Sequence, residues 1–163
     1  INELLANVPA DLAGDANGDG VRDATKDEFV EIYNRSGERL DLGGVSIRVG
    51  ETVKHTFSGC LEAGEALVVF AGTDGMLPTL DGVQFLVADR TFRLSNSGGT
   101  MTIVAADVVI DTITWTNAPA ASLVRNPELA PESPFAAHNR VAATLFSPGT
   151  CAGGAPLSTG CTQ

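Results

Sequence analysis

The sequence predicts an all-β protein, and three features point to that class. Short runs rich in Val, Ile and Thr recur about every ten residues, a spacing typical of antiparallel sandwiches and barrels. Turns containing glycine separate these runs, and the 163 residues include 18 glycines and 8 prolines. No stretch has the apolar spacing of an amphipathic helix over a useful length. We therefore expect one domain of short strands joined by tight turns.

Five strands are expected in the first half of the chain. INELLANV (1–8) alternates apolar and polar side chains, and an acidic loop follows it. In EFVEIYN (28–34) successive side chains point to opposite faces of a sheet, so one of the two sets must fill the core. The turn RSGER leads to LDLGGVSIRVG (40–50) and ETVKHTFSG (51–59). After the glycine-containing turn LEAGE, ALVVFAG (66–72) continues the series.

Five more strands are expected in the second half. VQFLVAD (83–89) and FRLSN (92–96) come first. The turn SGG has the composition of a tight hairpin and joins FRLSN to TMTIVAA (100–106). VVIDTITW (108–115) and ASLVRN (121–126) complete the set.

The composition changes after the last expected strand. Residues 1–126 carry the β pattern, whereas residues 127–163 are rich in Pro, Ala and Gly, with isolated apolar residues such as Phe135 and Phe146. We expect this C-terminal segment to be irregular and to wrap over the same domain, packing those side chains singly.

The balance of charge excludes several partners. Twenty Asp and Glu against ten Lys and Arg give a net charge of −10 at pH 7. Phosphate binding needs Lys and Arg to displace counterions, so we expect neither nucleic acid nor an anionic membrane surface as a partner. The apolar runs are also shorter than the roughly 18 residues that a membrane-spanning helix needs.

The three cysteines leave two disulfide pairings open. None of them lies in a CxxC pair or at ligand spacing from a histidine, which argues against zinc. Cys151 and Cys161 enclose the loop CAGGAPLSTGC, which would have little to order it without a bridge, so a bond between them is one alternative. The other is a bond from Cys60 to one of the two. The remaining thiol would be buried as a small apolar group or available to a neighbouring chain.

The acidic loop GDANGDGVRDATKDEF (14–29) has the spacing of a calcium site in its first half. It contains the pattern D-x-N-x-D-G, in which Gly20 allows the sharp turn. The expected oxygen ligands are Asp15, Asn17, Asp19, the carbonyl of Val21, and Asp23. Hard oxygen ligands favour calcium over zinc or copper.

The second half of the loop departs from that pattern. Its closing position, where a bidentate Glu is expected, is Lys26, a cation that cannot ligate. Asp27 or Glu28 would close the shell late, and Glu3 on a neighbouring strand is a further oxygen donor. We expect a structural calcium with the affinity of extracellular modules, about 10⁻⁴–10⁻³ M. The alternative is a metal-free turn held by hydrogen bonds from backbone to side chains.

Few residues are candidates for catalysis. His55 lies on an expected strand and His138 in the C-terminal segment, where packing or hydrogen bonding accounts for each. Asp107 and Asp111 share one face of a strand, as solvated surface acids do. No nucleophile elbow, zinc-protease motif or Cys/His pair occurs. A calcium shell filled by protein would also lack the open position that metal catalysis needs. We therefore expect no enzyme activity.

An ordered set of motifs resembles a known family. They are INE, DEFVEIYNRSGERLDLGGVSI, HTFSGCLEAGEALVVFAG, LSNSGGTMTIV, VVIDTITW, ASLVRNP, FAAH and FSPGT. Together they resemble the bacterial lamin-tail domain over nearly the whole chain up to Thr150. The resemblance implies an immunoglobulin-like β-sandwich on a secreted or surface-attached protein, found alone or beside nucleases and other hydrolases.

Two functions agree best with these features. The first is a non-enzymatic, calcium-stabilised module that binds another protein outside the cell or at its surface. The second is a subunit that assembles with copies of itself into a filament or surface layer, because open edge strands can accept a strand from a neighbour. An accessory domain of a secreted nuclease or hydrolase agrees less well, since a net charge of −10 opposes contact with DNA.

Overall fold

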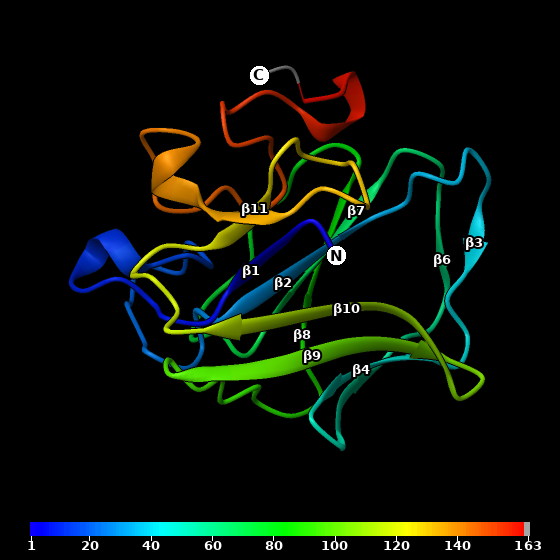
Figure 1. Cartoon of the computed structure of the whole chain (residues 1–163), viewed down its shortest axis with the longest axis horizontal. Helices are drawn as coiled ribbons and strands as arrows, with labels where there is room; N and C mark the ends of the chain where they lie inside the picture. Colours follow the sequence, from blue (N-terminus) through cyan, green and yellow to red (C-terminus); the bar gives the residue numbers. More distant parts are fainter. Residues whose placement is uncertain (162–163) are drawn as a thin grey trace.

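The computed structural model describes residues 1–161 as two β-sheets that face each other across a core (Figure 1). The larger sheet has the strand order β12 (Phe135–Ala137), β11 (Leu123–Arg125), β1 (Glu3–Leu5), β2 (Phe29–Tyr33), β7 (Ala66–Phe70) and β8 (Val83–Val87). The smaller sheet has the order β10 (Val108–Thr116), β9 (Gly98–Ala105), β4 (Val45–Val49) and β5 (Thr52–Thr56). This arrangement confirms the predicted all-β, immunoglobulin-like sandwich.

Short elements complete the described part of the chain. A two-stranded ribbon of β3 (Leu40–Asp41) and β6 (Cys60–Leu61) stands at one end of the sandwich (Figure 1). The helical elements are three 3-10 turns, η1 (Leu12–Gly14), η2 (His138–Arg140) and η3 (Leu157–Thr159). Within residues 1–161 no helix has the length and apolar character that crossing a membrane requires.

One pair of neighbouring strands is not antiparallel. β7 and β8 run parallel, with Ala66 opposite Val83 and Phe70 opposite Val87. The expectation of a purely antiparallel sandwich is therefore wrong at this edge of the larger sheet. Parallel neighbours cannot be joined by a tight turn, and residues 71–82 form the longer connection that they need.

The central strands of the larger sheet are buried on both faces. On the face toward the smaller sheet, Leu4 and Val30 pack in the main core. On the outer face, Phe29 and Phe70 form a second cluster, and Phe146 from the C-terminal segment packs edge-on against Phe29. The side chains on both faces of β2 are therefore buried, whereas the sequence pattern required burial of one face only.

The expected strand at 92–96 is wrong. These residues are irregular, although Phe92 and Leu94 are buried in the main core. The backbone N–H of Leu94 donates to Glu28 Oε1 at 2.9 Å, so a side chain takes the place of a neighbouring strand as acceptor. The alternating apolar side chains of FRLSN thus pack in the core, although their backbone does not pair with a strand.

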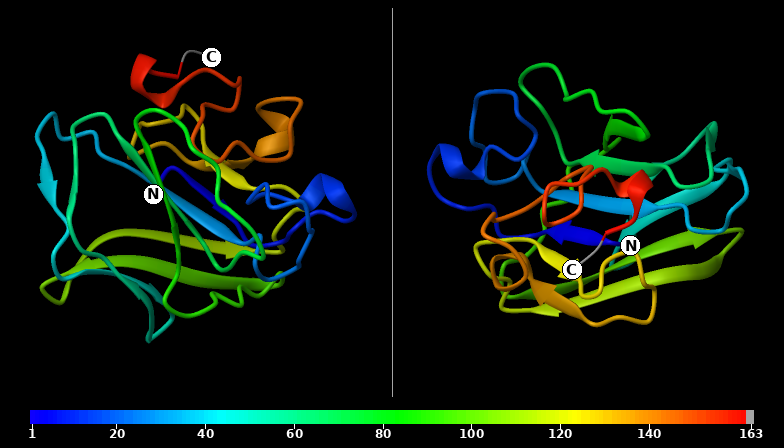
Figure 2. Two further views of the ribbon diagram at one scale, coloured as in Figure 1. Left: turned by 180° about the vertical axis from the view of Figure 1, so that it is seen from behind. Right: turned by 90° about the horizontal axis from the view of Figure 1, so that it is seen from above.

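The C-terminal segment is less irregular than expected. β12 pairs with β11, Leu123 opposite Ala137, and so extends the larger sheet beyond the expected boundary at residue 126. The remainder of the described segment folds over the outer face of that sheet, as its orange and red colours show in Figure 2. Residues 162–163, which the sequence assigned to the same segment, lie outside the described residues.

The close approach of Trp115 to β9 gives a prediction about stability. The indole N–H of Trp115 donates to the carbonyl of Ser95 at 2.9 Å, and a Cβ built on Gly99 would lie 2.7 Å from the indole ring. Gly99→Ala should therefore lower the free energy of unfolding by about 1–3 kcal/mol, the usual result of overpacking a filled core. Urea denaturation measures this change.

Gly153→Ala is the matched control, because a Cβ at that position meets nothing within 4 Å. It should change the free energy of unfolding by no more than about 0.5 kcal/mol. Equal effects of the two substitutions would contradict the packing argument.

Candidate functional site

The acidic loop is organised around Asp27, which is fully buried. Asp27 Oδ1 accepts hydrogen bonds from the backbone N–H groups of Ala16 (2.8 Å) and Asn17 (3.0 Å), and Oδ2 accepts one from Asp23 (2.7 Å). Burial raises the pKa of Asp27. The sequence had offered Asp27 as a late ligand of a calcium ion. In the structure it accepts the hydrogen bonds that hold the loop together.

Two of the expected ligands accept hydrogen bonds from backbone N–H groups. Asp15 Oδ2 accepts from Gly20 at 2.9 Å. Asp19 accepts from Asp74 at 2.6 Å and from Val21 at 2.9 Å. The bond from Asp74 is the main cause that lowers the pKa of Asp19.

The side chains of Asp23 and Asn17 also form hydrogen bonds with the backbone. Asp23 Oδ1 accepts from the N–H groups of Lys26 (2.9 Å) and Thr25 (2.8 Å), and these bonds lower the pKa of Asp23. The amide of Asn17 donates to the carbonyl of Gly72 at 3.2 Å, which ties the loop to the crossover that leads to β8.

The side chains of this loop do not converge on one point. Within residues 1–161 no group of three acidic, His or Cys side chains could hold a metal ion together. Lys26, at the closing position, forms an ion pair with Asp74. Asp15 Oδ1 is buried and accepts no hydrogen bond, and the same holds for Glu28 Oε2 at the end of the loop. The observed bonds hold the loop through its backbone N–H groups and leave these two acceptors without a partner.

Glu28 and Glu3, which the sequence offered to complete the shell, make other contacts. Glu28 Oε1 accepts from Leu94, and Oε2 is buried without a hydrogen-bond partner. Burial raises the pKa of Glu28 to about 8. Glu3 is bonded to Ser122 and Ser147 beneath the C-terminal segment, so the structure does not bring it to the acidic loop.

Glu3 and Glu31 face each other across β1 and β2, and both are fully buried. Glu3 accepts from Ser122 Oγ (2.5 Å) and from the N–H and hydroxyl of Ser147 (2.9 and 2.8 Å). Glu31 accepts from the N–H of Gly149 at 2.7 Å. Burial raises the pKa of both carboxyls, that of Glu31 to about 8. These bonds attach the C-terminal segment to the outer face of the larger sheet.

His138 belongs to the same buried group. Its Nε2 lies 2.9 Å from Ser147 Oγ, and its Nδ1 lies 2.9 Å from the carbonyl of Thr144. A serine and a histidine at this distance resemble a nucleophile and its base. Both side chains are buried, however, and the second ring nitrogen meets a carbonyl where a catalytic triad has a carboxylate. The pair therefore has the geometry of a structural contact.

The other candidates for catalysis lie in ion pairs. His55, on β5 of the smaller sheet, has its Nδ1 3.4 Å from Asp89, which follows β8. Asp111 is 3.3 Å from Arg125, and Asp107 forms an exposed ion pair at the end of β9. These groups do not share a site with one another or with His138.

A disulfide joins Cys151 and Cys161, whose Cα atoms are 5.4 Å apart, which is the first of the two pairings considered. Cys60 carries a free, partly buried thiol on β6. Within the closed loop, Leu157 is buried in a small cluster with Ala66 of β7. The bridge therefore closes a loop that packs on the outer face of the larger sheet.

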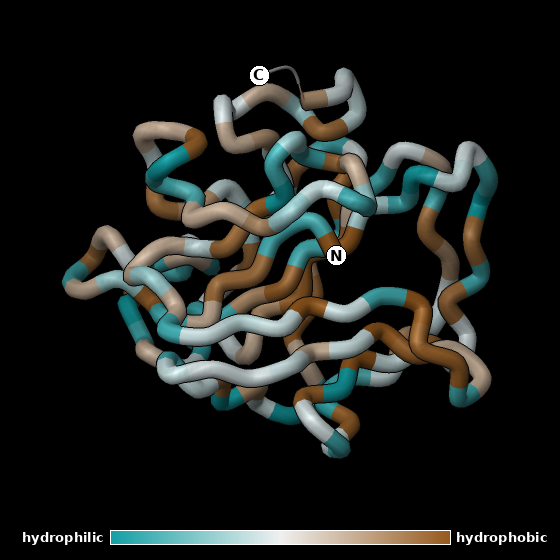
Figure 3. The backbone as a smooth tube through the Cα atoms, in the orientation of Figure 1, coloured by the Kyte–Doolittle hydropathy of each residue, from teal (hydrophilic) through white to brown (hydrophobic). Residues whose placement is uncertain are grey.

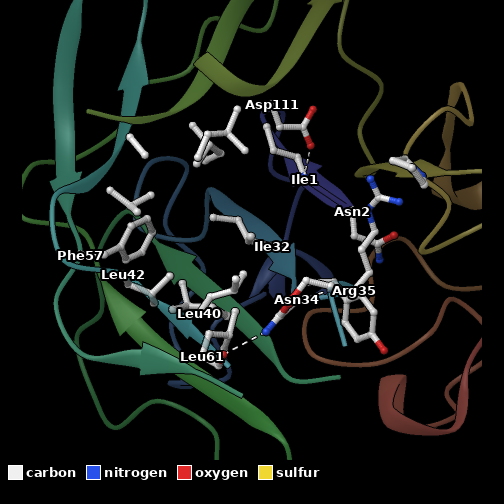
Figure 4. Close-up of a pocket in the computed structure, with 18 of the residues that line it drawn as sticks. Ile1, Asn2, Ile32, Asn34, Arg35, Leu40, Leu42, Phe57, Leu61 and Asp111 are labelled. Carbon is white, nitrogen blue, oxygen red and sulfur yellow. Dashed lines mark hydrogen bonds and ion pairs between the residues drawn. The ribbon is translucent and has the colours of Figure 1, made fainter. Parts of the chain in front are cut away.

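A cavity of about 710 Å³ opens between the two sheets at the end that carries β3 and β6. This volume lies within the range of roughly 300–1,000 Å³ found for ligand pockets. Apolar side chains from both sheets and from the ribbon point into it (Figure 4). Among them are Ile32, Leu40, Leu42, Phe57 and Leu61.

Asn34 fixes one wall of this cavity. It is buried at the end of β2, and its amide nitrogen donates to three carbonyls, those of Glu38 (2.8 Å), Leu61 (3.0 Å) and Glu62 (2.9 Å). The ribbon is thereby held against the larger sheet, and the wall is formed before any partner binds.

Charged side chains surround the mouth of the cavity. Arg125 pairs with Asp111, and its guanidinium lies 4.4 Å from the centre of the Phe135 ring. Arg35 and Glu132 also line the cavity and are exposed, and neither forms an ion pair within the described part of the chain. The mouth thus carries one free positive and one free negative group.

The hairpin of β9 and β10 projects beside this mouth. Val108, Val109 and Ile110 at the start of β10 are 65%, 55% and 62% exposed, and Ile110 also lines the cavity. Figure 3 shows the hydrophobic colouring at this tip. Sequence reasoning missed this surface, although three consecutive apolar residues where the strand should alternate were a signal for it.

Comparison with protein families gives one match. A family model described as the Lamin Tail Domain matches residues 10–117. No curated protein matches the chain. The matched span contains the smaller sheet and the ribbon, whereas β1, β11, β12 and the C-terminal segment lie outside it.

The buried carboxyls predict how stability depends on pH. The pKa of Glu31 is about 8 in the folded protein and about 4.5 when exposed. The contribution of protonated Glu31 to the free energy of unfolding is therefore fully present below pH 4.5 and is lost as the pH rises to 8. Asp19 and Asp23 have lowered pKa values, so their contribution is lost as the pH falls below 3.8. The midpoint of urea unfolding should therefore be highest at about pH 4–4.5 and decline toward pH 8.

Glu31→Gln tests the origin of that decline. The amide keeps an acceptor for Gly149 but stays neutral, so the loss of stability between about pH 5 and pH 8 should shrink by at least about 1 kcal/mol. The part that remains belongs to the other buried carboxyls whose pKa values are raised, namely Glu3, Asp27, Glu28 and Glu128. Glu51→Gln, at an exposed position, is the control and should leave the profile unchanged. An unchanged profile for Glu31→Gln would contradict the assignment.

Proposed function

The chain belongs to the lamin tail domain family, and on that premise we propose that it is a module that binds another protein through the open end of its sandwich. Lamin tail domains are generally non-catalytic and also occur as accessory domains of enzymes. The candidate catalytic groups of this chain support the non-catalytic role, because each is engaged in a structural contact and none faces the cavity together with a second one.

The apolar end of the sandwich is the observation that supports this function most directly. A cavity of about 710 Å³ and three exposed apolar side chains of β10 adjoin each other there. Contiguous apolar surface with a polar rim marks interaction sites on soluble proteins. Asn34 holds one wall in place through three hydrogen bonds, so little ordering is needed when a partner binds.

We further propose that the module acts outside the cell or at its surface. Disulfides persist mainly in oxidising surroundings, and the Cys151–Cys161 bond closes a surface loop that has no strand of its own. The net charge of −10 supports a soluble protein that does not contact nucleic acid.

We also propose that the acidic loop takes up calcium as a stabilising ion. Two features support this: the spacing of Asp15, Asn17, Asp19 and Asp23, and the buried Asp15 Oδ1, which has no partner. A carboxylate oxygen that accepts one hydrogen bond still has a lone pair for a cation. Binding would require the four side chains to converge, and Asp27 would remain the centre of the backbone bonds.

A calcium titration tests this proposal. With a dissociation constant of about 10⁻⁴–10⁻³ M, about 10 mM calcium should raise the free energy of unfolding by about 1.4–2.7 kcal/mol over chelated protein. Asp15→Asn should remove most of this gain, whereas Asp81→Asn, an exposed acid outside the loop, should retain it. A melting temperature that is the same in calcium and in chelator would exclude the site.

Photo-crosslinking in the native source tests the proposed interaction. A benzophenone amino acid at Val109, beside the cavity, should give crosslinked products of higher mass. The same amino acid at Leu12 is the control, because Leu12 is 66% exposed and begins the 3-10 turn η1, the blue turn at the end of the sandwich opposite the β9–β10 hairpin tip (Figure 1). Equal crosslinking at the two positions, or none at Val109, would contradict the proposal.

A further inference from the structure

We infer that the open end of the sandwich binds the same end of a second copy of this chain, forming a two-fold symmetric dimer. The inference rests on the proposed function, since it names the partner of the same surface. In the dimer, the tip of the β9–β10 hairpin of each copy covers the cavity of the other.

The hairpin tip has the shape and chemistry of a projecting anchor. Val108, Val109 and Ile110 are each more than half exposed, although β-branched side chains of this kind are usually buried. The cavity beside them is lined by side chains of the same apolar kind. One surface therefore presents an apolar projection and an apolar hollow next to each other.

Their adjacency determines the symmetry. Ile110 belongs to both features, because it lies in the exposed tip and lines the cavity. In a two-fold interface, the same patch on both copies must be self-complementary, and a projection beside a hollow meets that condition. A head-to-tail filament would instead need the projection and the hollow on different ends of the molecule.

The charges at the mouth agree with this symmetry. Arg35 and Glu132 line the cavity from opposite segments of the chain, the end of β2 and the C-terminal segment, and neither has an ion-pair partner in residues 1–161. In the proposed dimer, Arg35 of each copy lies against Glu132 of the other. Such a pairing occurs twice, and it provides local complementarity although each chain carries a net charge of −10.

The contact is formed by side chains and not by a shared sheet. β10 is an edge strand, but the pairing of β9 and β10 is irregular between Val109 and Asp111. A bulge at an edge twists the backbone away from a regular partner strand and protects the edge from pairing. Asp111 is held by Arg125 at the same place. Apolar packing at the tip therefore carries the association.

A small apolar molecule is a weaker occupant of this surface. It would fill the cavity but would leave Val108 and Val109 in water, because neither of them lines the cavity. A second copy covers the projection and the hollow together.

Sedimentation equilibrium of the full chain tests the inference. The natural protein should form dimers with a dissociation constant of about 1–100 µM, as suits a small interface with few anchors. Ile110→Asp should weaken dimerisation about tenfold or more, the effect of losing a central apolar contact. Leu12→Asp adds the same charge at an equally exposed apolar position on the opposite end and should leave the dimer unchanged.

Charge reversal gives a second test that does not depend on the apolar tip. Arg35→Glu and Glu132→Arg should each weaken the dimer about threefold to tenfold, the range for exposed pairs that occur twice. The double variant should restore dimerisation to within about twofold, because it only exchanges the two signs. All four residues tested are exposed, and circular dichroism confirms that each variant is folded.

Each outcome decides the inference. A natural protein that stays monomeric at about 1 mM would overturn it, as would larger assemblies without a dimer. Crosslinks from Val109 to a different protein, together with a monomeric chain, would overturn the dimer while leaving the interaction module intact. Binding of a fluorescent fatty acid to the cavity of a monomer would overturn both. Restoration by the double charge variant would establish the two-fold contact.

Discussion

Glu3 and Glu31 lie opposite each other in the larger sheet and are fully buried, and the rest of the fold depends on how their carboxyl groups are satisfied. Two unpaired carboxyls in an apolar interior would be strongly destabilising. Asn2 and Ser122 supply one hydrogen-bond donor each, and the other donors come from Ser147 and Gly149, so the C-terminal segment satisfies part of both carboxyl groups. Burial then favours the protonated state of both groups.

This constraint separates two parts of the molecule. The outer face of the larger sheet is closed by the C-terminal segment and the Cys151–Cys161 bond, whereas the opposite end stays open between the sheets. The C-terminal segment that covers this face lies outside the span that matches the family model, whereas the cavity walls lie mostly within that span. The acidic loop connects β1 to β2, and the hydrogen bonds that Asp27 accepts from its backbone hold this connection in place.

Rigidity of this kind suits a binding module. Asn34 fixes the ribbon, Arg125 fixes the edge of β11 against Asp111, and the apolar tip of β10 stays exposed between them. Exposing three apolar side chains opposes solubility, so their retention beside a hollow agrees with a surface that is covered in the functional state. The two-fold contact that we infer uses the end of the sandwich where the cavity adjoins the exposed apolar residues of β10.

The sequence by itself determined the all-β class, the family, most strands and the position of the acidic loop, because alternation, turn residues and motif order act over a few neighbouring residues. The tertiary structure decided which partners those residues meet. Glu3, which was expected to bind calcium, accepts a hydrogen bond from Ser147. Residues 92–96, which were expected to form a strand, pack in the core without pairing with another strand. The bonds from Glu3 and Glu31 to Ser122, Ser147 and Gly149 join residues more than a hundred positions apart, as the cavity also does. Such contacts depend on how the sheets stack, which local patterns do not encode.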